Sequence, residues 1–168
     1  KKLPDPRTTG SGNAGATNML RSTGLNNAAI VMIVDIVKGL VAIIIARILG
    51  ASAGVLSLVA LATVLGHIYP VFFKFKGGKG VATMLGCLIG LAPLTGILCF
   101  VIWGAVLYLT KYASLASIAT ACSSVVLTFL FGDTVHTFSL LIITMLIIYT
   151  HKENLLRLKN GTENKVEF

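Results

Sequence analysis

The sequence predicts an all-α bundle of membrane-spanning helices in one domain. Apolar residues make up 55% of the 168 residues and charged residues only 12%, and the mean hydropathy is +0.89. This composition excludes an ordinary soluble domain, because soluble domains carry about 25% charged residues. Long apolar runs also alternate with short polar connections, which is typical of multi-pass membrane proteins. We therefore expect residues 1–168 to form a single membrane domain.

Residues 1–25 are polar and rich in Gly, Ser, Thr and Asn, so they predict a loop rather than a regular element. The first apolar run, residues 26–49, exceeds the length of about 20 residues that a helix needs to cross a bilayer. A second run, residues 53–69, begins shortly after Gly50 and is ended by Pro70. Both runs therefore predict membrane helices.

The third apolar run, residues 81–92, is shorter than the others and is ended by Pro93. A helix of this length measures about 18 Å, whereas the hydrocarbon core of a bilayer is about 30 Å thick. The run therefore predicts a half-helix that follows a glycine-rich loop at the membrane boundary. Three further membrane helices are predicted at residues 94–110, 112–131 and 134–150, which gives six in total, and residues 151–168 form a polar tail.

Consecutive membrane segments alternate in direction, so the connections between them fall on two sides. The N-terminal loop, residues 66–80, residues 111–114 and the tail share one side. The positive-inside rule makes this side cytoplasmic. We expect the net charge of +8 to reflect membrane orientation and phosphate binding, not a nucleic-acid partner. The predicted cytoplasmic side holds 12 of the 14 Lys and Arg residues, namely Lys1, Lys2, Arg7, Arg21, Lys74, Lys76, Lys79, Lys111, Lys152, Arg157, Lys159 and Lys165.

Residues 66–80, directly before the half-helix, combine cationic and titratable side chains with glycines. Free backbone amides, lysine side chains and the positive end of a helix dipole attract an anion to the same place. The segment is not a Walker A nucleotide loop, because Gly80 follows Lys79 where that motif requires Ser or Thr. It predicts a site for a phosphate-bearing substrate, built from His67, Lys74, Lys76, Gly77, Gly78, Lys79 and Gly80.

The N-terminal loop contains a run from Gly10 to Gly15 that fits the pattern G-x-G-x-x-G. No strand precedes this run, and the acidic residue that would bind a ribose, Asp35, lies inside an apolar segment, so we exclude a dinucleotide-binding fold. Glycines still allow a close approach of the backbone to a ligand. The polar groups that the loop offers are Ser11, Asn13, Thr17, Asn18 and Arg21.

Other polar residues interrupt or flank the apolar runs. Asp35 and Lys38 stand three residues apart on one helical face, and we expect them to pair or to face a polar cavity. Two serines three residues apart favour either helix–helix contacts or a place in the site. The three cysteines are widely spaced inside apolar runs, so no metal site is expected. The remaining candidates are Ser114 and Ser117, together with His151, Asn154 and Arg157, which share one face if a helix continues past residue 150.

Four stretches resemble the bacterial acyl-phosphate:glycerol-3-phosphate acyltransferases, the PlsY family. They are residues 10–18 with Arg21, residues 66–83, residues 114–117, and residues 151–154 with Arg157 and residues 161–163. The resemblance implies an enzyme of phospholipid biosynthesis in the bacterial inner membrane. Such an enzyme transfers a fatty acyl group from acyl phosphate to the 1-hydroxyl of sn-glycerol 3-phosphate, giving lysophosphatidic acid and phosphate without cofactor, metal or coenzyme A. The family has seven membrane helices, one more than we predict here. The additional helix precedes the loop that contains residue 10.

The resemblance and the local chemistry together imply roles for particular residues. Acyl phosphate is expected near Ser11, Asn13, Gly77, Gly78 and Lys79, and glycerol 3-phosphate near Arg21, Lys74 or Lys76, His151 and Asn154. Catalytic roles are expected for Ser11, Asn13, His67, Lys79 and His151. Substrate binding is expected for Gly12, Thr17, Asn18, Arg21, Lys38, Lys74, Lys76, Gly77, Gly78, Thr83, Ser114, Ser117, Asn154 and Arg157.

The sequence leaves alternatives open for the catalytic base and for the class of protein. No histidine is followed five positions later by aspartate, so the His-x4-Asp pair of other glycerolipid acyltransferases is absent. The base is His67, His151 or an oxygen of a substrate phosphate. A transporter or flippase for an organic phosphate would also use buried cations and broken helices, although no inverted repeat of the glycine segment is visible.

Overall fold

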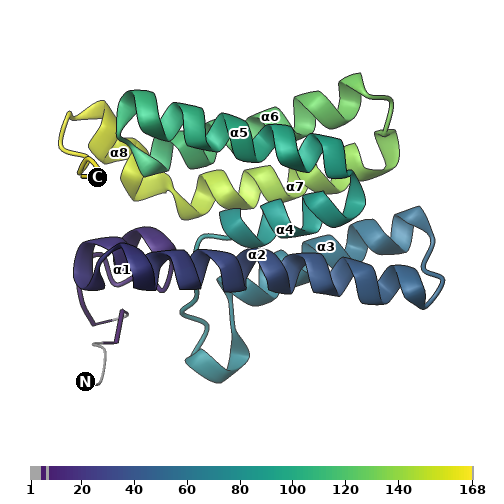
Figure 1. The fold of residues 1–168 in the computed structure, drawn as a ribbon, viewed down its shortest axis with the longest axis horizontal. Coiled ribbons are helices and arrows are strands. Elements are labelled where there is room, and N and C mark those ends of the chain that lie inside the picture. The colour runs from purple at the N-terminus through teal and green to yellow at the C-terminus, as the bar shows by residue number, and fades with distance from the viewer. Residues whose placement is uncertain (1–4, 7, 168) are drawn as a thin grey trace.

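The computed structural model describes residues 5, 6 and 8–167, so that Lys1, Lys2 and Arg7 of the predicted basic side lie outside the described residues. Every regular element in this range is a helix (Figure 1), which confirms the all-α prediction. The elements are α1 (Ala16–Thr23), α2 (Leu25–Ile48), α3 (Ala53–Ile68), the short 3-10 helix η1 (Val71–Phe73), α4 (Val81–Leu91), α5 (Pro93–Thr110), α6 (Ala113–Leu130), α7 (Thr134–Thr150) and α8 (Lys152–Lys159).

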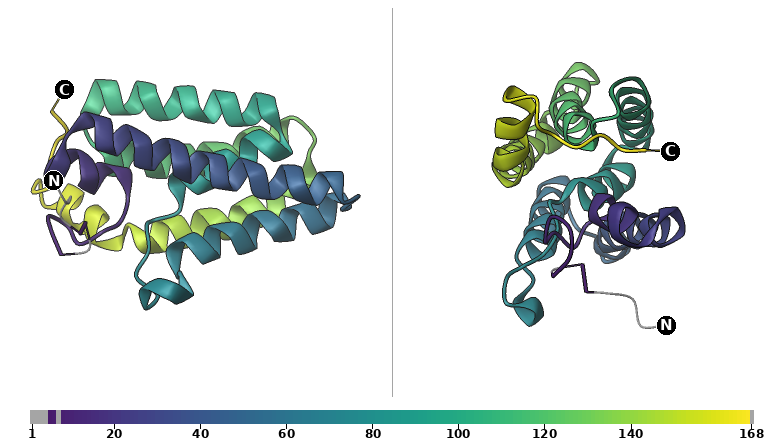
Figure 2. Two further views of the ribbon diagram at one scale, coloured as in Figure 1. Left: turned by 60° about the horizontal axis from the view of Figure 1, so that its bottom comes forward. Right: turned by 90° about the vertical axis from the view of Figure 1, so that its left-hand side faces the viewer.

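The short helix α4 lies at the centre of the bundle. The long helices α2, α3, α5, α6 and α7 run beside it (Figures 1 and 2), and α4 contacts all five. Its side chains Met84 and Leu88 are completely buried, and they join a core to which the other helices contribute Ile43, Val64 and Ile143. Because α4 touches so many neighbours, its N-terminus is held in a fixed position inside the bundle.

Glycines allow α2 and α4 to approach each other closely. A Cβ atom added to Gly86 of α4 would collide with the carbonyl oxygen of Ile36, and one added to Gly39 of α2 would collide with the carbonyl oxygen of Thr83. Small residues at a helix crossing are typical of membrane bundles, where backbone packing replaces the hydrophobic effect as the driving force. This crossing explains why the sequence can bury a half-helix in the bundle.

Length and hydropathy identify the helices that can cross a membrane. In the described part of the chain, α2, α5, α6 and the segment Ala53–Phe73 that contains α3 are long and apolar enough, and α7 joins them if it is counted together with α8. The helix α4, with 11 residues, is shorter, as the sequence predicts. All six expected segments are therefore helical, while four or five of them meet the criteria for a full crossing.

One local prediction was wrong. The region 1–25 is not all loop, because α1 occupies residues 16–23 and packs against α2. The last span ends at Thr150 as predicted, and the helix that follows it, α8, meets α7 at an angle of 60° around His151. The helix α8, which follows this bend, lies at the end of the bundle (Figure 1).

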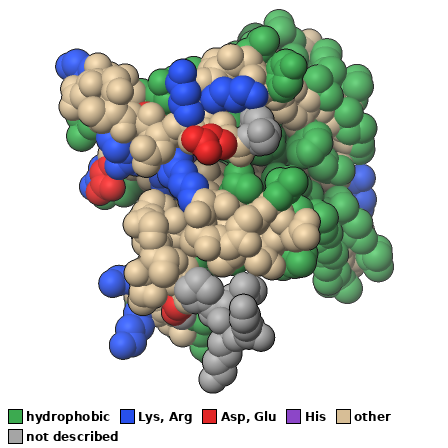
Figure 3. Space-filling view, turned by 60° about the vertical axis from the view of Figure 1, so that its left-hand side comes forward, with side chains coloured by type: hydrophobic (Ala, Val, Ile, Leu, Met, Phe, Trp, Pro, Cys, Tyr) green, Lys and Arg blue, Asp and Glu red, His purple; other side chains and the backbone are tan. Residues whose placement is uncertain are grey.

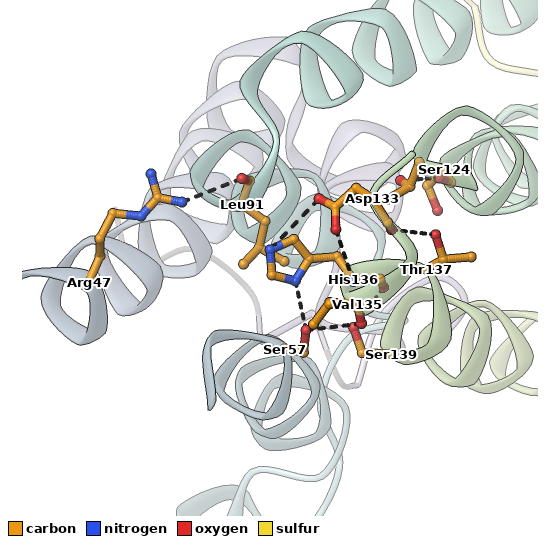
Figure 4. A network of polar contacts seen from close by, with 10 residues as sticks. Arg47, Ser57, Leu91, Ser124, Asp133, Val135, His136, Thr137 and Ser139 are labelled. Carbon is orange, nitrogen blue, oxygen red and sulfur yellow. Dashed lines mark hydrogen bonds and ion pairs between the residues drawn. The ribbon is translucent and has the colours of Figure 1, made fainter. Parts of the chain in front are cut away.

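The two ends of the bundle differ in character. Figure 3 shows most of the visible Lys and Arg side chains at the end where α1 and α8 lie, whereas hydrophobic side chains cover the flank. At the opposite end, the hydroxyl of Ser57 on α3 lies 2.7 Å from Nδ1 of His136 on α7, and Asp133 lies 3.8 Å from Nε2 (Figure 4). In this group Ser57 and His136 are buried. The group lines neither of the cavities described below and ties α3 to α7.

Candidate active site

A cavity opens at the basic end of the bundle, at the place where the separate sequence motifs meet. Its walls come from the N-terminal loop and α1, the N-terminus of α4, α2, α5, α6, α8 and the C-terminal tail, and its volume is about 120 Å³. The cavity residues that the sequence predicts for the site are Ser11, Asn13, Thr17, Asn18, Arg21, His67, Lys79, Ser114, Ser117, His151, Asn154 and Arg157.

The amide of Asn18 shapes the N-terminal loop. Its Oδ1 accepts the backbone N–H of Ser11 (2.9 Å), and its Nδ2 donates to the carbonyls of Pro6, Thr9 and Asn13 at 2.7–3.0 Å. Both ends of this buried amide are therefore occupied by the loop itself. Asn13 Oδ1 accepts the N–H of Gly15, while in the described residues the Asn13 Nδ2 and the Ser11 hydroxyl have no protein partner and remain free for a ligand.

The N-terminus of α4 forms the floor of the cavity. Lys79, Gly80, Val81 and Ala82 all line it, and the helix starts after Gly80 without a side-chain cap. The N–H groups of the first helical turn have no carbonyl one turn earlier, so they attract an anion. The amides of Gly77 and Gly78 instead donate to the carbonyls of Ile68 and His67. The expectation of free amides at these two glycines was wrong, and the free amides lie a few residues later.

Lys79 supplies a half-buried cation directly beside this helix terminus. Its Nζ donates to Oδ1 of Asn154, and its carbonyl accepts the hydroxyl of Thr150. Burial, followed by the nearby guanidinium of Arg157, lowers the pKa of Lys79 to about 8. The ammonium form is thus costly without an anion, and a bound phosphate would stabilise it.

The carboxylate of Glu163 organises the part of the wall formed by α6, α8 and the tail. It accepts hydrogen bonds from the Ser114 hydroxyl (2.9 Å), Asn154 Nδ2 (2.7 Å) and Arg157 Nε (2.7 Å). Burial alone would raise the pKa of Glu163, but these three hydrogen bonds outweigh burial and lower it. Glu163 therefore stays ionised and holds the side chains that follow the bend between α7 and α8. The site prediction omitted Glu163, although it belongs to the tail segment 161–163 that carried the family resemblance.

His151 lies at the bend, with its ring buried in the cavity wall. Nδ1 lies 2.8 Å from the carbonyl oxygen of Ile147, so that Nδ1 carries the proton and Nε2 is an acceptor. Burial and then the charge of Lys79 lower the pKa of His151 to about 4. The ring is neutral at pH 7 and is a weak base.

A second cavity, of about 340 Å³, lies beside the first and shares Asp35 and His67 with it. Its lining includes Lys38 and the predicted loop residues Lys76, Gly77 and Gly78. The predicted Asp35–Lys38 pair is present, with Nζ 2.6 Å from Oδ1. Lys38 Nζ also lies 2.5 Å from Nδ1 of His67, so that the pair reaches from α2 to the end of α3.

Three predicted residues line neither cavity. Gly12 lies in the N-terminal loop with a positive φ of 69°, and Lys74 is exposed on the arm that contains η1. Thr83 is fully buried in α4 beside Gly39, and its hydroxyl has no partner among the described residues. The structure therefore does not bring these three residues to the site.

One part of the first cavity's lining is apolar. Met32 of α2, Leu85 of α4, and Phe100 and Trp103 of α5 line it. Sequence reasoning did not find these residues, because they sit in apolar runs where nothing distinguishes a lipid-facing side chain from a cavity-lining one. One cavity thus combines a cationic, hydrogen-bonding end with an apolar end.

Comparisons with known proteins agree with one another. A family model described as glycerol-3-phosphate acyltransferase matches residues 1–161. The chain is 50% identical over 166 residues to the glycerol-3-phosphate acyltransferase of Coxiella burnetii (strain Dugway 5J108-111), covering 99% of this chain and 86% of that protein. It is 44% identical over 169 residues to the protein of the same name from Neisseria meningitidis serogroup C (strain 053442), covering 98% and 84%.

The fold also matches solved structures. In its glycerol 3-phosphate form, the crystal structure of PlsY, an integral membrane glycerol 3-phosphate acyltransferase, superposes with a TM-score of 0.92 at 41% identity, covering 98% of this chain and 83% of that one. In its lysophosphatidic acid form, PlsY superposes with a TM-score of 0.87 at 42% identity, covering 94% and 81%.

Proposed function

This chain belongs to the glycerol-3-phosphate acyltransferase family of integral membrane enzymes, and we propose that its acyl donor is acyl phosphate. The acyl group is transferred to the 1-hydroxyl of sn-glycerol 3-phosphate, which gives lysophosphatidic acid and inorganic phosphate. The observation that carries this proposal is the cavity with one cationic and one apolar end. Such a cavity suits a phosphate-bearing alcohol and a phosphate-activated fatty acid side by side.

The cationic end offers more positive charge than one phosphate needs. Lys79, Arg21 and Arg157 line it together with the N-terminus of α4, and only Arg157 is paired with a buried carboxylate, Glu163. Guanidinium groups bind phosphate oxygens in a bidentate manner, whereas a lysine acts as a point charge. We assign the phosphate of glycerol 3-phosphate to Arg21 and Lys79, and the phosphate of the donor to the α4 amides with Ser11 and Asn13.

The acyl chain is placed against Met32, Leu85, Phe100 and Trp103. These side chains come from α2, α4 and α5, and Phe100 is 41% exposed on the flank of the bundle. A chain in contact with them extends toward the bilayer, where the donor's hydrocarbon is already dissolved. Binding then requires little transfer of apolar surface through water.

The reaction needs orientation and charge stabilisation more than a strong base. The 1-hydroxyl attacks the acyl carbonyl carbon, a new C–O ester bond forms, and the C–O bond to phosphate breaks. The α4 amides stabilise the negative charge that moves onto the carbonyl and then the leaving phosphate. His151 is a poor proton acceptor with its low pKa. A substrate phosphate oxygen, with a pKa near 6, takes the hydroxyl proton instead.

The active site is placed on the cytoplasmic face of the bacterial inner membrane. The support for this is the gathering of Lys and Arg side chains at the end that holds the cavity (Figure 3) and the positive-inside rule. The alternative of a phosphate transporter would require a path through the bundle. Both cavities include residues of the loop at residues 66–80 or of the N-terminal loop, which lie at the basic end.

The test is a donor comparison with purified protein in detergent micelles. Labelled glycerol 3-phosphate is supplied with either palmitoyl phosphate or palmitoyl coenzyme A, and labelled lysophosphatidic acid and released phosphate are measured. We expect equal amounts of both products with acyl phosphate and none with the thioester. Product formation from the thioester alone would refute the assigned donor. The variant Asn13→Ala should lower the rate about 100-fold, and Lys159→Met, on the exposed end of α8, should not.

A further inference from the structure

Three charged or titratable side chains form the wall between the two cavities. Asp35 and His67 line both cavities, and Lys38 lines the second. They come from the middle of α2 and the end of α3, and Asp35 is only 9% exposed. None of them is bonded to the Glu163 group. The mechanism described above uses none of them.

The geometry of this group restricts the protonation of the histidine ring. Lys38 Nζ lies 2.6 Å from Asp35 Oδ1 and 2.5 Å from His67 Nδ1, while Asp35 Oδ1 is 3.5 Å from Nδ1. A lysine ammonium beside a carboxylate can only donate. Nδ1 must therefore accept, which leaves the proton of a neutral ring on Nε2.

We propose that Lys38, held by Asp35, fixes the tautomer of His67 in which Nε2 carries the proton and acts as a hydrogen-bond donor to a phosphate oxygen. The Nε2 edge lies against Gly78, where an added Cβ would collide with it. Among the described residues, no acceptor pairs with Nε2, and the lack of a side chain at Gly78 leaves the space beside Nε2 for a ligand oxygen. The identity of that ligand rests on the proposed function, whereas the tautomer does not.

This assignment removes His67 from the candidate bases. A ring whose Nδ1 receives a bond from an ammonium and whose Nε2 is protonated has no nitrogen free to take a proton. Lys38 and Asp35 are then positioning residues that act through His67. The backbone carbonyl of His67 also accepts the N–H of Gly78, and this bond helps to fix the loop that leads to Lys79.

Nitrogen NMR of the ring tests the tautomer without any substrate. The chain contains three histidines, so selective ¹⁵N-histidine labelling gives a small set of signals that His67→Gln and His136→Gln assign. We expect wild-type His67 at pH 7 to show a protonated Nε2 and an unprotonated Nδ1. A spectrum with protons on both nitrogens, or on Nδ1 alone, would overturn the proposal even if the enzyme is active.

Substitution of Lys38 tests the positioning role. In Lys38→Met, the ring signals should change to a mixture of tautomers, and KM for glycerol 3-phosphate or the acyl phosphate should rise about tenfold, as expected for the loss of one oriented bond to phosphate. Lys38→Arg should restore both, and Lys159→Met is the matched control that removes a lysine charge elsewhere. An unchanged His67 spectrum in Lys38→Met would refute the positioning role, and the wild-type spectrum decides the tautomer if that variant does not fold.

Discussion

The pH dependence of kcat/KM for glycerol 3-phosphate should follow the ionisation of Lys79. Burial lowers the pKa of Lys79 to about 8, so that its positive charge is present below that pH and is lost as the pH rises through it. The phosphate ester, with a pKa near 6, is already a dianion. Between pH 7 and pH 9 the protonated fraction falls from about nine tenths to about one tenth, and kcat/KM, which reports the free enzyme, should fall about tenfold.

Two substitutions make this prediction specific to one side chain. In Lys79→Arg the guanidinium stays charged throughout the range, so kcat/KM should be lower but flat up to pH 9. In Lys79→Met it should be flat and about 10- to 100-fold lower at pH 7, because a charge-assisted bond to phosphate is lost. The assay measures labelled lysophosphatidic acid at substrate concentrations below KM, with Lys159→Arg as control. An alkaline fall that persists unchanged in Lys79→Arg would refute the reasoning.

Three further predictions concern stability and the acyl chain. Glu163→Gln should lower the free energy of unfolding by about 2 kcal/mol. Since the folded pKa of Glu163 is lowered, the melting temperatures of variant and wild type should converge as the pH falls through that folded pKa. A constant difference between the two melting temperatures would contradict the assignment. Gly86→Ala should lower the free energy of unfolding by about 1–3 kcal/mol, because the added methyl group collides with α2. In the control Gly104→Ala, the methyl group meets no atom within 4 Å, so the melting temperature should be nearly unchanged. Equal melting temperatures for the two variants would contradict the close crossing. Trp103→Ala should raise KM about tenfold for a long-chain acyl phosphate and much less for a short-chain one, and an equal change for both donors would remove Trp103 from the acyl wall.

Hydropathy and proline positions predict most of the fold. Pro93 and the short apolar run before it indicate the half-helix at residues 81–92, which the structure places at Val81–Leu91. The sequence does not predict α1, because its Asn and Thr residues have low helix propensity and the helix depends on packing against α2. The bend at His151 is also hidden, since the three-residue spacing of His151, Asn154 and Arg157 satisfies a continuous helix equally well.

The site was predictable to the extent that local sequence decides it. Most of the predicted polar residues meet in one cavity, because membrane topology places their loops at the same end of the bundle. The precise roles depend on contacts between distant segments. Asn18 is taken up by the loop backbone, and Glu163 returns from the tail to order three side chains. No periodicity or motif spacing indicates either arrangement.

The partly exposed side chains of Phe100 and Trp103, at the lipid-facing side of the cavity, have a consequence for how the reactants reach the site. In the reaction proposed above, a water-soluble alcohol would reach the cavity from the cytosol while a hydrocarbon tail would arrive through the bilayer, so neither reactant would have to change phase. The amphiphilic ester that results would be released directly into the leaflet.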